Sequence, residues 1–164
     1  MSESTSIASD DVMAAIGAAV ERGRSGDRAG ARESLTRLWD AVGEHGDALH
    51  RCSIAHYLAD LQDTVADELT WDRRALAAVT DLDDERARHF HDSLRVRAFL
   101  PSLHLNLADA YRRAGEPAEA RVHLSAAATD LAALPDDDYG SMIRAGIARA
   151  REALDSGSRR PLEP

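Results

Sequence analysis

The most reactive side chains of the sequence fall on one line of a helix predicted over 48–62. Cys52, His56 and Asp60 are four residues apart, so on a helix each side chain can touch the next. A thiol beside a base beside a carboxylate is the order required for an activated nucleophile. Catalysis would also require an oxyanion pocket and a positioned substrate, which a straight helical line does not supply. The pattern is compatible with three interpretations: a catalytic thiol, a redox-sensitive thiol, or the packed inner face of a helix. It favours the third.

Histidines are the other candidates for chemistry, because imidazole is a common metal ligand. His89 and His91 are two residues apart, so on a helix they point in nearly opposite directions. His45 and His50 flank a predicted loop, but no further residues complete a ligand set. We therefore expect no metal, no cofactor and no enzymatic activity. The alternative is a helical small-molecule or metal-binding protein, or an enzyme, centred on His50, Cys52, His56 and Asp60.

Composition restricts the class of protein. The 164 residues include 29 acidic and 20 basic side chains, a net charge of −9, which argues against nucleic-acid binding. The single cysteine cannot form an internal disulfide, as is typical of a reducing compartment. No apolar stretch approaches the length of a membrane span, and the first residues do not resemble a secretion signal. We expect a cytoplasmic protein that binds neither nucleic acid nor membrane.

Apolar residues recur at helical spacing almost throughout the chain, and runs of alternating strand type are missing. The sequence predicts an all-α fold of about seven antiparallel helices joined by short turns. Asp27 is placed to cap a helix, Gly115 to end one, Pro117 to begin one, and Pro101 to kink or break a long helical region. A single domain over 10–155 is expected to contain helix pairs at about 12–45, 46–80 and 101–134, an inserted helical segment at 83–100 and a capping helix at 138–154, between disordered tails at 1–9 and 156–164.

One of these helix pairs carries a recognisable pattern. In the segment HLNLADAYRRAGEPAEARVHLSAAATDL, Leu107, Ala108 and Tyr111 lie at the Leu, Gly and Tyr positions of a tetratricopeptide repeat, followed by Ala120 and Leu124 at its Ala and Phe positions. Pro101 and Pro135 stand 34 residues apart, the length of one such repeat. The segment resembles the tetratricopeptide repeat family, and the flanking pairs resemble it more loosely. The resemblance implies a short right-handed superhelix of stacked helix pairs, closed by the C-terminal helix.

The same resemblance implies a function and a surface. In that family the first helix of each pair lines a concave groove, and the family's asparagine at the position of Asn106 holds a peptide backbone or terminal carboxylate. Arg113 could pair with a ligand carboxylate through two hydrogen bonds. We therefore expect a non-catalytic adaptor that binds a protein, a peptide or a second copy of the chain. The residues expected to meet the partner are His50, Tyr57, Arg95, Leu105, Asn106, Asp109, Arg112 and Arg113.

Overall fold

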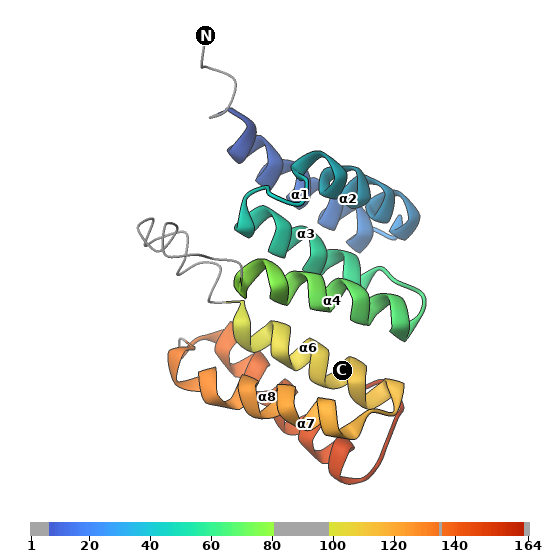
Figure 1. The fold of residues 1–164 in the computed structure, drawn as a ribbon, viewed down its shortest axis with the longest axis vertical. Coiled ribbons are helices and arrows are strands. Elements are labelled where there is room, and N and C mark those ends of the chain that lie inside the picture. The colour runs from blue at the N-terminus through green and yellow to red at the C-terminus, as the bar shows by residue number, and fades with distance from the viewer. Residues whose placement is uncertain (1–6, 81–98, 135, 163–164) are drawn as a thin grey trace.

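Every long element in the described part of the chain is a helix (Figure 1). The computed structural model describes residues 7–80, 99–134 and 136–162, and no strand occurs within these ranges. The predicted all-α fold is confirmed. Consecutive helices pack against one another, and they follow each other along the longest axis of the molecule from α1 to the α7–α8 end.

The first helix pair consists of α1 (Ile7–Arg24) and α2 (Arg28–Val42). In the turn between them Gly26 has a φ of 107°, a conformation that glycine adopts without steric cost. The Asp27 carboxylate then accepts a hydrogen bond of 2.9 Å from the backbone N–H of Gly30. This confirms the predicted N-cap, which satisfies one of the free N–H groups at the start of α2.

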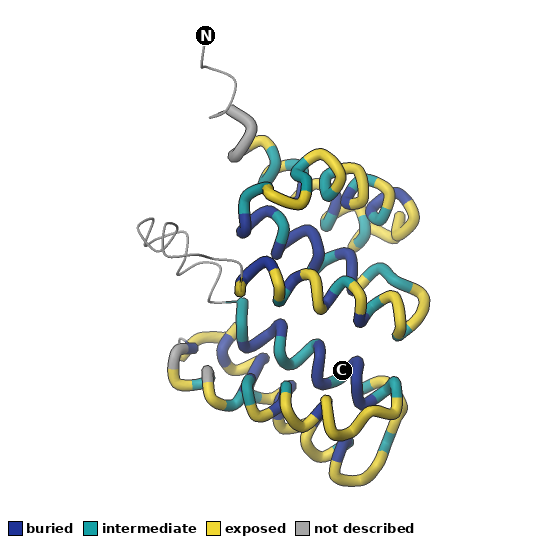
Figure 2. The backbone as a smooth tube through the Cα atoms, viewed as in Figure 1, coloured by how far each residue is buried: buried dark blue, intermediate teal, exposed yellow. Residues whose placement is uncertain are grey.

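The second pair consists of α3 (Ala48–Asp60) and α4 (Val65–Thr80). Asp47 caps α3 by accepting hydrogen bonds from the N–H groups of Leu49 and His50. Helix α3 is buried over most of its length (Figure 2), because it packs against α1, α2 and α4. Apolar residues lie on more than one side of the helix, as a helix packed between neighbours requires.

The third pair consists of α6 (Leu100–Ala114) and α7 (Pro117–Thr129), followed by the short 3₁₀ helix η2 (Asp130–Ala133). Pro101 lies in the first turn of α6, where its missing N–H costs nothing. Gly115 ends α6 with a φ of 81° and Pro117 begins α7, both as predicted. The expected inserted segment 83–100 lies, apart from its last two residues, outside the described residues.

Helix α8 (Asp138–Asp155) closes the stack and packs against α6 and α7. We expected a disordered tail from residue 156, and this is corrected for residues 156–162, which the structure describes. Arg112 of α6 donates hydrogen bonds of 2.6 and 2.8 Å to the backbone carbonyls of Ser158 and Arg160. Leu162 packs against the apolar core between α4, α6, α7 and α8. The chain after α8 is therefore held against α6.

Two further apolar clusters lie towards the N-terminal end, one between α3, α4 and α6 and one between α1, α2 and α3. Trp39 of α2 and Trp71 of α4 border both clusters, with ring centroids 5.2 Å apart and planes at 87°. This edge-to-face contact joins the first helix pair to the second. None of the helices in the described part of the chain combines the length and apolar character needed to cross a membrane.

Candidate functional site

The predicted line of reactive side chains runs along α3, but its thiol is sealed in the core. Cys52 is fully buried within the cluster that includes Ala75 and Leu103, and this burial raises the pKa of the thiol to about 12. The thiol therefore stays protonated at neutral pH, whereas nucleophilic attack requires the thiolate. This geometry favours the packed inner face over an activated nucleophile.

His56 connects α3 to α6. Its Nδ1 atom lies 3.4 Å from Nδ2 of Asn106, fifty residues along the chain. Burial lowers the pKa of His56, although the negative charge of Asp60 acts in the opposite direction. A neutral imidazole can accept the hydrogen bond that the Asn106 amide donates. Asn106, which we expected to meet a ligand, is thus engaged with α3 while it remains partly exposed.

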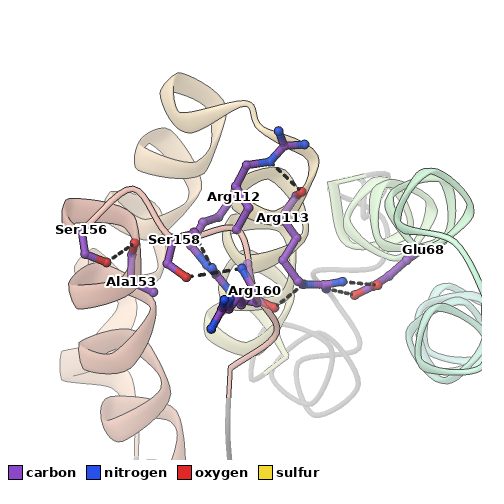
Figure 3. A network of polar contacts seen from close by, with 9 residues as sticks. Glu68, Arg112, Arg113, Ala153, Ser156, Ser158 and Arg160 are labelled. Atoms are coloured by element: carbon purple, nitrogen blue, oxygen red, sulfur yellow. Dashed lines mark hydrogen bonds and ion pairs between the residues drawn. The ribbon is translucent and has the colours of Figure 1, made fainter.

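Arg113 connects α6 to α4 (Figure 3). Its guanidinium donates two hydrogen bonds, of 2.6 and 3.1 Å, to the two carboxylate oxygens of Glu68. A third, of 2.9 Å, reaches Asp109 one turn earlier on α6. We expected Arg113 to pair with a ligand carboxylate, but the chain itself supplies the carboxylates. The side chain of Arg113 is 16% exposed, so these bonds are shielded from water.

A carboxylate without a partner lies among these groups. Asp72 of α4 is 1% exposed, and neither carboxylate oxygen has a hydrogen-bond partner among the described residues. Burial, together with the nearby charges of Glu68, Asp60 and Asp109, raises the pKa of Asp72 to about 8, although Arg113 acts in the opposite direction. We call the four carboxylates Asp60, Glu68, Asp72 and Asp109 the acidic junction, since they join α3, α4 and α6.

The acidic junction is largely missing from the residues that sequence reasoning selected. Only Asp109 was among the expected partner-binding residues, and Asp60 belonged to the alternative centre. The one available signal for Asp72 was its place on the apolar stripe of α4, three residues after the buried Leu69 and three before the buried Ala75. A charged residue on such a stripe points into the core.

The other residues predicted on α6 divide according to helical geometry. At 100° per residue, Asn106, Asp109 and Arg113 share the face that meets α3 and α4, whereas Leu105 and Arg112 share another. Leu105 lies against α8, where a Cβ added to Gly146 would come within 2.7 Å of its side chain. Arg112 is buried and holds Asp109 and the C-terminal segment. These two residues stabilise the packing of the α8 end.

Tyr57 lies elsewhere on α3, on the wall of a pocket of about 210 Å³ between α1, α2 and α3. The pocket has apolar walls that include Val20, Leu35 and Leu61, and its charged lining residues are Arg24, Arg28 and Asp60. His50, also predicted, is buried at the start of α3, and Arg95 lies outside the described residues. Asp60 lines the pocket and also belongs to the acidic junction.

A pair of histidines occupies the opposite side of α6. The Nδ1 atoms of His104 and of His123 on α7 lie 3.1 Å apart, and the ring of Tyr111 stacks on His123. Burial and the proximity of His104 lower the pKa of His123, so His123 favours its neutral form. Within the described ranges, His, Cys, Asp and Glu side chains do not gather in threes suited to hold a metal ion.

Comparison with protein-family models, with curated proteins and with solved structures finds no match to this chain. The functional interpretation therefore depends on the arrangement of its own side chains.

Proposed function

We propose that this protein is a non-catalytic module that binds an extended peptide or protein segment across α1, α3 and α6. The observation that carries the proposal is the group of partly or fully exposed side chains in the C-terminal half of α3, namely His56, Tyr57 and Asp60. At one end Tyr57 and Asp60 line the pocket against α1 and α2, and next to them His56 meets Asn106 of α6. These are the first helices of the three pairs, the position at which tetratricopeptide repeats bind peptides, and the third pair resembles that family.

The size of the pocket supports a peptide over a small molecule. Small-molecule sites commonly enclose about 300–1,000 Å³, whereas this pocket has about 210 Å³, suited to one apolar side chain. The protonated state of Cys52 and its lack of exposure disfavour the alternative centre at His50, Cys52, His56 and Asp60. A lone buried cysteine also suits a cytoplasmic protein.

A peptide library displayed on phage tests the proposal. The library is selected on immobilised wild-type protein, and enriched peptides are synthesised with a fluorescent label and measured by anisotropy. The double substitution Tyr57→Ala and Asn106→Ala is expected to weaken their binding at least tenfold. Both residues are partly exposed, so circular dichroism should show the variant to be folded.

Val122→Ala on α7 provides the matched control, since Val122 is exposed and lies outside the proposed surface. Equal binding of the enriched peptides by wild type and by the folded double variant would contradict the proposal. A second copy of the chain is also a candidate partner. Light scattering over a concentration series tests this, with Tyr57→Ala expected to disrupt any dimer that uses the same surface.

A further inference from the structure

The acidic junction holds four carboxylates, and the cations hydrogen-bonded to them are Arg112 and Arg113. Glu68 and Asp109 share the guanidinium of Arg113, and Asp109 also accepts from Arg112. Asp72 lies behind them with both oxygens unpartnered among the described residues. Buried carboxylates are ordinarily hydrogen-bonded or paired with a cation. We propose that the acidic junction binds a cationic side chain, arginine or lysine, of the peptide partner.

The charges that face Asp72 come from all three helices. Helix α3 contributes Asp60, α4 contributes Glu68, and α6 contributes Asp109 and the cation of Arg113. His56, beside Asp60 on α3, favours its neutral form and adds little positive charge. The potential at Asp72 is therefore negative, which attracts a cation and repels an anionic or carboxylate ligand.

The rim of the junction is reachable from solvent although Asp72 is buried. The side chains of Glu68 and Asp109 are 22% and 20% exposed, and Asp60 is exposed. The pKa of Asp60 is nevertheless raised, chiefly by desolvation, as expected for a carboxylate with protein on several sides. A guanidinium or ammonium at this rim would stabilise the ionised form of Asp72 without direct contact, because opposite charges act over about 4–6 Å.

This inference rests on the proposed function and specifies the chemistry of its ligand. Asp60 lines both the pocket and the junction. A peptide that places an apolar side chain beside Tyr57 would bring a neighbouring basic residue to the acidic rim. Both features together predict partners with an apolar and a basic residue close in sequence.

The test uses Nα-acetyl-L-arginine amide as the probe, titrated into full-length ¹⁵N-labelled protein. The uncharged isostere Nα-acetyl-L-citrulline amide is the matched control. We expect saturable shifts of backbone amides at 56–60, 68–72 and 106–113 with the arginine probe and none with citrulline. Equal shifts with both probes, or arginine shifts confined to other regions, would overturn the proposal.

Two variants and a pH series complete the experiment. At pH 9, Asp72→Asn is expected to weaken binding of the arginine probe at least fivefold, whereas Glu33→Gln on the exposed face of α2 should leave it unchanged. Because the bound cation favours ionised Asp72, the affinity of wild type should rise up to roughly tenfold between pH 7 and pH 9. The folded Asp72→Asn variant should lose this rise. Unchanged affinity in that variant overturns the proposal.

Failure of this inference is distinguishable from failure of the proposed function. Phage-selected peptides without a shared basic residue, whose binding still depends on Tyr57 and Asn106, would leave the proposed function intact and remove the cationic site. A shared basic residue combined with sensitivity to Asp72→Asn would support both.

Discussion

Arg113 and Glu68 lie 45 residues apart in the chain and form a two-pronged ion pair between α6 and α4. The pair links the second helix pair to the third at a point where the intervening residues 81–98 are outside the described structure. The side chains of Arg113 and Glu68 are 16% and 22% exposed. In its degree of burial the pair is therefore intermediate between a surface salt bridge and a buried one. Its contribution to stability can be measured directly.

We expect Arg113→Ala to lower the free energy of unfolding by about 2 kcal/mol, because it leaves the partly buried Glu68 without its ion-pair partner. Urea denaturation monitored by circular dichroism measures the change. Arg37→Ala is the matched control, since Arg37 and its partner Glu33 are both highly exposed and such pairs contribute about 0.5 kcal/mol or less. Equal losses in the two variants would show that the Arg113 pair is no stronger than a surface pair.

Asp72 makes stability depend on pH. The ordinary pKa of an aspartate side chain is 3.8, and the pKa of Asp72 in the folded protein is about 8. Between these values the folded state holds a proton that the unfolded state has lost, so the stability contributed by Asp72 falls as pH rises. Asp72→Asn should match wild type near pH 4 and exceed its free energy of unfolding by about 1–3 kcal/mol near pH 8. Thermal melts at several pH values test this, and a constant difference would contradict it.

Arg112 should determine whether the chain after α8 stays in place. Arg112→Ala removes the donors to the carbonyls of Ser158 and Arg160, so we expect faster hydrogen exchange at 157–162 and a loss of about 1–3 kcal/mol. Arg160→Ala keeps the backbone carbonyl that Arg112 uses and should exchange like wild type. Equal protection of 157–162 in Arg112→Ala and wild type would mean that other contacts hold this segment.

Cys52 should not react while the protein is folded. Its thiol is buried and its pKa is raised to about 12, so Ellman's reagent should label it only at the rate of unfolding. Addition of 6 M guanidinium chloride should give one thiol per chain at once. Rapid labelling of the native protein would contradict the assignment of Cys52 to the core. It would support the alternative interpretation, a reactive thiol beside His56.

Local features of the fold could be predicted from sequence because their causes are local. The cap at Asp27, the glycine turn at 115 and the start of α7 at Pro117 follow from backbone preferences of single residues. Helix α3 was expected over 48–62 and spans 48–60. The last helix of the third pair was expected to continue to 134, whereas α7 ends at Thr129 and its final turn tightens into a 3₁₀ helix.

The candidate site could be predicted only in part, because its contacts join distant segments. Asn106 and Asp109 were found through the resemblance to a repeat, but their engagement with His56 and Arg113 depends on how α6 packs on α3 and α4. The ordered segment after α8 was missed because the acceptors for Arg112 are backbone carbonyls, which every residue possesses. Polar composition alone therefore suggested a tail.

The edge-to-face contact of Trp39 with Trp71 has a consequence for spectroscopy. These are the two tryptophans of the chain, and both report on the boundary between the first two helix pairs. Indole emission therefore reports on the first two helix pairs and on their contact with α6, whereas ellipticity at 222 nm averages over all the helices. If the stack melts from one end, as linear arrays of helices can, the two signals will give different midpoints, and their order will show which end opens first.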